Sequence, residues 1–150
     1  MATANEKFKG KYTKTKTLNK EYSVNRNAAL QVSNSYGNIE VTTWNENRTV
    51  IEVTITTNGD DEEKVQKRLD EISVDFSGTA SKVTAKTVFG GKKSNSWSLW
   101  GKKNNVHMEI NYSIKLPVTN SVDLSNDYGA IRLNRLEGNA RINCDYGQIV

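Results

Sequence analysis

The sequence repeats a short cassette three times, and each copy is built around a Tyr-Gly pair. The pairs are Tyr36-Gly37, Tyr128-Gly129 and Tyr146-Gly147, and the last two tyrosines are 18 residues apart (146 − 128 = 18). Counted from each tyrosine, apolar residues recur at positions −6, −4 and +3, and at +5 wherever the chain extends that far. A repeat of this length predicts stacked β-units, in which equivalent residues of successive units lie next to one another.

We expect the turn between the two strands of each cassette to lie at the Tyr-Gly pair. Glycine adopts positive φ without steric cost, so the sequence predicts Gly37, Gly129 and Gly147 at the position of the turn that needs it. Asn, Asp or Ser just before each tyrosine are expected to hydrogen-bond to the turn backbone. Residues 136–139 predict a second corner, and Trp44, at the equivalent place in the first cassette, predicts a similar corner there.

Two arrangements fit two strands per repeat. In a meander, equivalent strands are separated by another strand, whereas in a coil they stack directly, so that tyrosine lies on tyrosine and isoleucine on isoleucine. The identical offsets favour the coil. We therefore predict a mainly β, stacked-coil fold of the β-solenoid or β-helix type, in which Tyr36, Tyr128 and Tyr146 form a structural ladder. A ligand-binding role is the alternative interpretation of these tyrosines.

The rest of the sequence predicts one short helix and a β-hairpin, inserted between the first and second cassettes. Acidic residues at 60–63 suit the positive end of a helix dipole, and Val65, Leu69 and Ile72 follow at helical spacing. Two alternating segments joined at 77–80 predict the hairpin. Alternating strands are also predicted at 7–24, with a lysine-rich outer face, at 49–56 and at 106–116.

A chain of 150 residues with 35% hydrophobic residues is expected to form one domain with a thin core. We divide it into a first coil at 28–57, the helix, hairpin and a further strand at 58–120, and repeated coils at 121–150. The sequence stops at Val150 inside the third cassette, which predicts a piece of a longer protein, truncated at its C-terminus. Cys144 is the single cysteine, so an internal disulfide is excluded, and we interpret it as a filler of the strand or turn.

Four features, taken in this order, resemble the family of putative bacterial adhesins with a β-solenoid domain of unknown function. They are the segment 35–44 (Ser-Tyr-Gly-Asn-Ile-Glu-Val-Thr-Thr-Trp), the acidic helix leading to 72–75, the strand 111–117 and the terminal Tyr-Gly coils. The resemblance covers residues 28 to 150. Such proteins are common in Bacteroidetes and other bacterial envelopes, so it implies a secreted or surface-associated module of repeated β-coils. The family has no established catalytic residues, and the segment 90–105 is not part of its pattern.

Residue types required for common catalytic and cofactor chemistry are sparse. His107 is the single histidine and lies in an alternating segment, where an ordinary strand residue is a simpler interpretation than a catalytic base. The acidic run at 60–63 lacks the ligand spacing of a calcium loop, and Gly-Gly-Lys-Lys at 90–93 lacks the remaining P-loop pattern. We therefore predict no enzyme activity, no cofactor and no metal. The net charge of +4 is too mild to predict nucleic-acid binding.

Residues 90–103 have the composition most typical of a binding site. Two lysine pairs flank two tryptophans, and the six residues are Lys92, Lys93, Trp97, Trp100, Lys102 and Lys103. Aromatic faces stack on sugars or insert at membrane interfaces, while lysines attract phosphates and carboxylates. We therefore expect these residues to contact an anionic glycan, the cell envelope or a membrane surface. The alternative is a long hairpin whose tryptophans fold back onto the sheet and whose lysines are solvated.

The leading hypothesis is a non-enzymatic, extracytoplasmic module for adhesion or envelope interaction, placed in the periplasm, outer membrane or cell surface, with its leader removed. Repetition would itself present ladders of polar side chains to a partner. One alternative is a polysaccharide-acting β-helix enzyme, which requires clustered carboxylates or basic residues in a groove. The other is an envelope-stress sensor that contacts membrane or peptide through the lysine- and tryptophan-containing segment.

Overall fold

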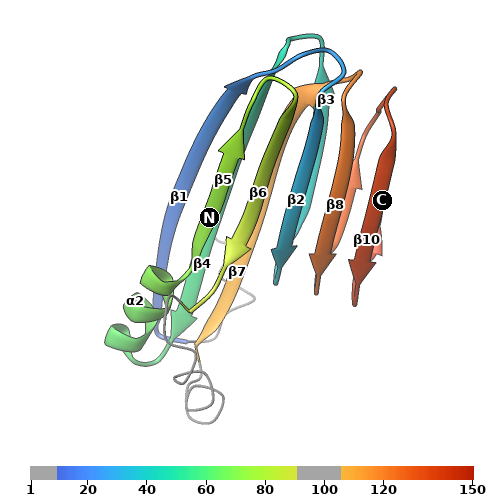
Figure 1. Cartoon of the computed structure of the whole chain (residues 1–150). Coiled ribbons are helices and arrows are strands. Elements are labelled where there is room, and N and C mark those ends of the chain that lie inside the picture. Colours follow the sequence, from blue (N-terminus) through green and yellow to red (C-terminus); the bar gives the residue numbers. More distant parts are fainter. Residues whose placement is uncertain (1–9, 91–105) are drawn as a thin grey trace.

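The computed structural model describes residues 10–90 and 106–150, and in these ranges the protein is mainly β with one helix. The described strands form two sheets that lie face to face, with α2 at one end beside β1 (Figure 1). The strand order of sheet A is β1-β4-β7-β3-β9-β11, and that of sheet B is β10-β8-β2-β6-β5. The elements are β1 (Tyr12–Ser23), β2 (Ala29–Ser35), β3 (Ile39–Trp44), β4 (Arg48–Gly59), α2 (Glu62–Glu71), β5 (Ser73–Gly78), β6 (Lys82–Val88), β7 (His107–Pro117), β8 (Ser121–Asp127), β9 (Ala130–Leu133), β10 (Ala140–Asp145) and β11 (Gln148–Ile149).

The three cassettes stack side by side without any shift in register. In each cassette one strand lies in sheet B and the next lies in sheet A, so the chain crosses between the sheets at the Tyr-Gly pair. In sheet B, β8 runs parallel to β2 and β10 and pairs Leu124 with both Val32 and Ile142. In sheet A, β9 pairs Ile131 with both Ile39 and Ile149. The prediction that equivalent residues of successive cassettes lie next to one another is confirmed. The described residues contain no closed solenoid, so the solenoid stays a prediction.

The core lies between the two sheets and follows the apolar positions of the cassettes. Leu30, Val32 and Leu124 from sheet B meet Ile39 and Ile131 from sheet A, and each of the five is at most 1% exposed. Burial alternates along these strands because successive side chains of a strand point to opposite faces. Each such side chain stabilises the fold by roughly 1.5–3 kcal/mol relative to an exposed one. The periodicity that identified the cassettes is therefore the periodicity of the core.

The path after the first cassette differs from the sequence prediction. β3 does not turn toward sheet B at Trp44; the chain continues into β4, which stays in sheet A with β7 between it and β3. The Trp44 indole N–H donates to the Arg48 carbonyl oxygen at 2.9 Å, and the Arg48 guanidinium lies 4.6 Å from the ring centroid. Trp44 thus closes a turn within one sheet. The predicted corner at 136–139, by contrast, does lead from β9 in sheet A to β10 in sheet B.

The predicted helix and hairpin are both confirmed. Asp61 is the N-cap of α2, and its Oδ1 accepts hydrogen bonds from the backbone N–H groups of Glu63 and Lys64 at 3.1 and 3.3 Å. Val65, Leu69 and Ile72 are buried, as their spacing predicts. Strands β5 and β6 form the antiparallel hairpin.

The lysines of β1 lie on the opposite side of the sheet from the one predicted. Lys16 and Lys20 pair with Ile55 and Ile51 of β4, whose side chains are buried, so these lysines share the inner side of sheet A rather than its outer face. Lys14 lies on the same side and pairs with Glu62 of α2 at 3.0 Å. β1 is an edge strand, and inward-pointing charges there discourage pairing with another chain.

A buried chain of polar groups crosses the core between β7 and sheet B. The Thr87 hydroxyl lies 2.7 Å from the Tyr112 hydroxyl and donates to Asn34 Oδ1 at 2.8 Å. Because Thr87 has one proton to donate, the Tyr112 hydroxyl is the donor in the first of these hydrogen bonds. Burial raises the pKa of Tyr112 to about 12, with the hydrogen bond to Thr87 offsetting part of the effect. The arrangement therefore requires a protonated Tyr112.

This raised pKa predicts a loss of stability in strong alkali. The contribution of Tyr112 is fully present below the pKa of about 10 expected in the unfolded chain, and it is lost as the pH rises toward 12, by roughly 2–3 kcal/mol. In urea unfolding at a series of pH values, Tyr112→Phe should lose stability less steeply than wild type between these limits. Parallel curves for the two proteins would contradict the assignment.

Candidate functional site

The Tyr-Gly turns have an unusual backbone conformation, and it falls on the tyrosines. Tyr36, Tyr128 and Tyr146 have φ values of 61°, 61° and 57°. The sequence prediction that the glycines take positive φ at these turns is therefore wrong. A bulky residue in the left-handed region is a genuine outlier and costs on the order of 1–3 kcal/mol. Because this cost recurs in all three turns, we infer that the tyrosine side chain makes a favourable interaction that an asparagine or a glycine could not make.

The glycines are required for a different reason, which is the close approach of neighbouring turns. A Cβ atom on Gly129 would overlap the carbonyl oxygen of Gly37, and one on Gly147 would overlap that of Gly129. A Cβ atom on Gly37 would overlap the carbonyl oxygen of Ile110 in β7. The turns therefore stack backbone on backbone, from β7 through the three cassettes. Glycine is the residue that leaves room for this contact.

A side-chain donor two residues before each tyrosine links each turn to the preceding one. Asn126 Nδ2 donates to the Gly37 carbonyl oxygen at 2.8 Å and to the Ala130 carbonyl oxygen at 3.2 Å. Asn34 Nδ2 makes the equivalent bond to the Ile110 carbonyl oxygen at 2.9 Å. In the third cassette the Cys144 Sγ lies 3.2 Å from the Gly129 carbonyl oxygen. The sequence predicted bonds to the turn backbone but missed that they reach the neighbouring cassette.

The three tyrosine rings form a column on the outside of the turns. Tyr36 and Tyr128 stack with centroids 5.1 Å apart and planes 4° apart, and Tyr128 and Tyr146 with centroids 4.8 Å and planes 6° apart. Phe89 meets Tyr36 edge to face, with centroids 6.1 Å apart. The tyrosines are 43%, 50% and 79% exposed in chain order. The predicted ladder is confirmed, and it is an exposed surface as well as a packing device.

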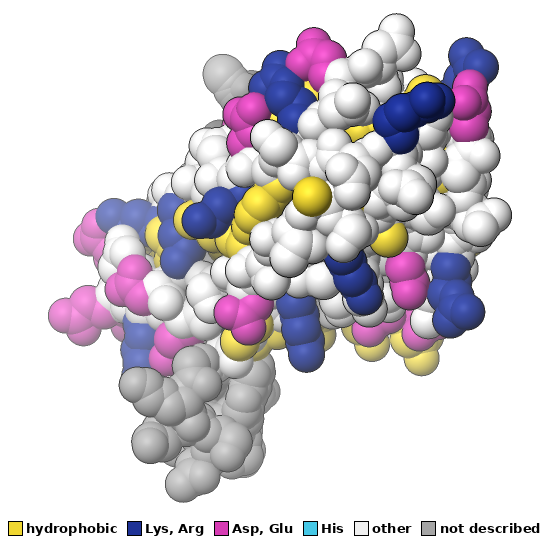
Figure 2. Space-filling model, turned by 45° about the horizontal axis from the view of Figure 1, so that its top comes forward, with side chains coloured by type: hydrophobic (Ala, Val, Ile, Leu, Met, Phe, Trp, Pro, Cys, Tyr) yellow, Lys and Arg dark blue, Asp and Glu magenta, His cyan; other side chains and the backbone are white. Residues whose placement is uncertain are grey.

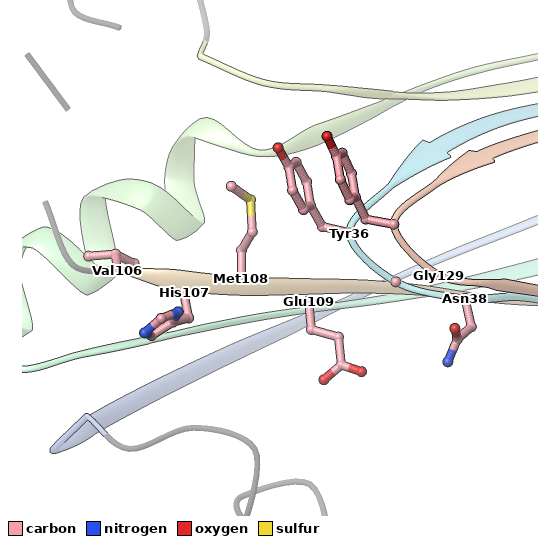
Figure 3. Close-up of a pocket in the computed structure, with 9 residues that line it drawn as sticks. Tyr36, Asn38, Val106, His107, Met108, Glu109 and Gly129 are labelled. Carbon is pink, nitrogen blue, oxygen red and sulfur yellow. The ribbon is translucent and has the colours of Figure 1, made fainter. Parts of the chain in front are cut away.

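A cavity of about 510 Å³ lies where the first two turns meet the beginning of β7 (Figure 3). Its lining comes from the two turns, from the first three residues of β7 and from the residue just before β7: Tyr36, Gly37, Asn38, Tyr128, Gly129, Val106, His107, Met108 and Glu109. Met108 projects to the same side of β7 as Tyr36, whereas His107 and Glu109 project to the other side (Figure 3). The cavity thus has an apolar, aromatic side and a polar side.

The lining of the cavity combines acid–base groups with aromatic and apolar side chains. His107 and Glu109 are present, but the described lining contains no hydroxyl or thiol of a serine, threonine or cysteine that could act as a nucleophile. No group of three or more metal-ligating side chains occurs among the described residues. Nearby on α2, burial lowers the pKa of Arg68, while the Glu71 carboxylate and Tyr36 act in the opposite direction.

The six candidate contacts predicted from the sequence all lie outside the described residues. They are Lys92, Lys93, Trp97, Trp100, Lys102 and Lys103. The described residues on either side of that segment are at the site, since Phe89 packs against Tyr36 and Val106 lines the cavity. The six Tyr-Gly residues lie together as a stack of turns. Sequence reasoning missed Met108 and Asn38, because no pattern in the sequence joins the start of β7 to the turns.

The chain is similar to several solved structures, all of them distant. No family model matches it, and no curated protein matches it. A protein named a putative cell adhesion protein from Clostridium sporogenes has 13% identity and a TM-score of 0.45, over 91% of this chain and 59% of its own. A putative adhesin from Bacteroides fragilis has 15% identity and a TM-score of 0.39, over 89% of this chain and 61% of its own. A putative lipid binding protein from Parabacteroides distasonis has 14% identity and a TM-score of 0.32, over 89% and 50%. The chain therefore spans at most 61% of the length of these three proteins.

The contact between turns predicts that Gly129→Ala is strongly destabilising. The added methyl group meets the backbone of Gly37, which cannot move without displacing the stack, so we expect a loss of about 3 kcal/mol or more in urea unfolding. Gly59→Ala is the matched control, because its Cβ atom would lie 3.0 Å from Cγ2 of Val65, a side-chain contact. We expect it to cost about 1 kcal/mol or less. Equal losses for the two variants would be evidence against backbone stacking.

The donor at position −2 predicts opposite effects for two further substitutions. Asn126→Ala removes the bonds to Gly37 and Ala130, and we expect it to lower the free energy of unfolding by about 1–3 kcal/mol. Cys144→Asn replaces a weak thiol donor by an amide, so stability should stay the same or rise by up to about 1 kcal/mol. Urea unfolding measures both. A clear loss for Cys144→Asn would show that the three positions are not equivalent.

Proposed function

We propose that this chain is a non-catalytic, extracytoplasmic binding module of the adhesin type, built on a β-solenoid-like array of Tyr-Gly coils. The observation that carries the proposal is the exposed tyrosine column beside a cavity with one aromatic and one polar side. The tyrosines hold their rings on a strained, left-handed backbone, and such strain clusters at binding sites. The ligand surface is the column together with the cavity, and the ligand belongs to the cell envelope: an anionic glycan or a membrane surface.

Several features support binding over the alternatives. The net charge of +4 favours an anionic surface, although its size does not favour nucleic acid. A typical glycoside hydrolase needs two carboxylates flanking the bond, and Glu109 is the one carboxylate in the described lining of the cavity. The envelope-sensor alternative depends on Trp97 and Trp100, which lie outside the described residues.

Among the described residues, no helix is long and apolar enough to cross a lipid bilayer.

Removing the column without disturbing the backbone tests this proposal. Asparagine tolerates the left-handed region, so Tyr128→Asn with Tyr146→Asn should keep the turns while removing two rings. Alginate, as an anionic glycan, and phosphatidylglycerol vesicles serve as probes in co-sedimentation. We expect wild type to bind at least one probe and the double variant to bind about tenfold or more weakly, since each lost aromatic contact is worth on the order of 1 kcal/mol.

Tyr12→Asn is the control, because Tyr12 lies on β1, away from the turns. Circular dichroism and the melting temperature establish that each variant is folded. A folded double variant that binds like wild type would refute the role of the column. Failure of wild type to bind either probe would refute the proposed ligand class.

A further inference from the structure

Strand β1 is one border of sheet A, and among the described residues it pairs with β4 alone. All 12 of its residues stand in unbroken register with β4, so the strand has no bulge, and it contains no proline. Its other side therefore offers a long, regular row of backbone N–H and C=O groups. An extended peptide pairs with such groups when it adds a strand to the edge of a sheet.

The inward side chains along β1 combine positive charge with apolar surface. Between residues 14 and 22 they are Lys14, Lys16, Leu18, Lys20 and Tyr22. Their register partners in β4 are buried, which places all five on the inner side of the sheet, and the two apolar members are only partly buried. In the space-filling view, exposed hydrophobic surface lies next to Lys and Arg side chains on the left of the molecule (Figure 2). The outward side of the strand carries one charged residue, Glu21, which pairs with Arg48 at 2.8 Å.

A carboxylate already meets one of these lysines. Glu62, the first residue of α2, forms an ion pair with Lys14 at 3.0 Å. Lys20 lies over the ring of Phe76 in β5, 5.8 Å from the ring centroid. Within the described part of the chain, no carboxylate forms an ion pair with Lys16 or Lys20. This border thus holds two positive charges without a matching acid, next to partly exposed apolar surface.

The inward charges select which strand could add to the border. Opposite charges directly across two paired strands are stabilising, and like charges are destabilising. A second copy of this chain is disfavoured, because two β1 strands would bring their lysines together and each chain has a net charge of +4. Since every second side chain of a strand points to the same face, acidic residues at alternate positions of an added strand would face the lysines. An apolar residue among them would cover Leu18.

We propose that the β1 border of sheet A binds an extended acidic segment of a partner protein, which adds to the sheet as a strand. Backbone pairing supplies affinity, and carboxylates opposite Lys16 and Lys20 supply specificity. A strand without acidic residues would leave both ammonium groups desolvated and unmatched, whereas an acidic strand neutralises them. β4 and β7 separate this border from β3, whose cassette contains Tyr36. The site is therefore distinct from the tyrosine column and does not depend on the proposed role of that column.

The experiment is a titration of the isotope-labelled full chain with two synthetic peptides, followed by amide chemical shifts and amide exchange. The acidic probe is acetyl-Thr-Glu-Thr-Val-Thr-Glu-Thr-Glu-Thr-amide, whose glutamates and valine match the inward lysines and Leu18 in antiparallel order. The basic probe has lysine in place of each glutamate. We expect the acidic probe to shift the amides of β1 and slow their exchange, and its affinity should fall about threefold or more between about 50 and 500 mM NaCl. The basic probe should shift none of them.

Paired variants locate the contact. Lys16→Gln with Lys20→Gln removes both unmatched charges, and we expect the acidic probe to bind about tenfold more weakly, since each cross-strand pair contributes about threefold. Lys82→Gln with Lys86→Gln is the matched control, because it removes the same charge from β6 in sheet B. This control should bind the acidic probe like wild type.

Three results of the wild-type titrations would overturn the proposal: no shift in β1 with the acidic probe, equal affinity for the basic probe, or shifts around Tyr36 and Tyr128 instead of β1. Equal losses of affinity in the two double variants would overturn it as well. The wild-type titrations decide the outcome even if a variant does not fold.

Discussion

The structure depends on contact between backbones at the Tyr-Gly turns. Each turn lies so close to the next that the carbonyl oxygen of one glycine occupies the space where a side chain of the next would begin. This contact fixes the register of the parallel strands on both sides of it, because Tyr128 N–H donates to the Asp145 carbonyl oxygen and Tyr36 N–H to that of Asp127. The strands of both sheets are therefore aligned by the stacked turns, and their alternating apolar side chains meet in one core.

The strain at the tyrosines is balanced by interactions that exist only in the stack. A lone Tyr-Gly turn would have the unfavourable φ of its tyrosine without a neighbouring ring. In the stack each ring gains an aromatic neighbour, and the carbonyl oxygens of Gly37 and Gly129 gain donors from Asn126 and Cys144. Aromatic pairs and hydrogen bonds of this kind contribute roughly 1 kcal/mol each, the same order as the strain. Since the benefit requires neighbours, the cassettes stabilise one another.

Much of the fold could be predicted because it follows from local patterns. The cassette offsets predicted both parallel ladders and the tyrosine column, and the acidic run before Val65 predicted α2. The direction of the β1 lysines could not be predicted from the sequence, because lysines and apolar residues both occupy the even-numbered positions of β1. Lys16 and Leu18, for example, lie on the same face of the strand. Likewise, the departure of the chain at Trp44 depends on contacts with Arg48 and β7, which lie outside the repeat.

At the Tyr-Gly turns, sequence reasoning identified the residues but assigned positive φ to the wrong one of each pair. The sequence correctly predicts tyrosine and glycine at the turn. It predicts positive φ at the glycine, however, because the steric preference of each residue considered alone favours glycine there. The close approach that excludes a side chain at Gly129 is a property of two cassettes together and has no local signal. The same applies to the cavity, which joins the turns to Met108 across a long stretch of sequence.

The inward lysines of β1 give the two lateral borders of sheet A different chemical character. A strand arriving beside β1 would have to desolvate the ammonium groups of Lys16 and Lys20, which is costly without matching carboxylates. At the other border lies β11, where Ile149 is 55% exposed. Inward-pointing positive charge is therefore a property of the β1 border, which it protects against an added strand that lacks such carboxylates.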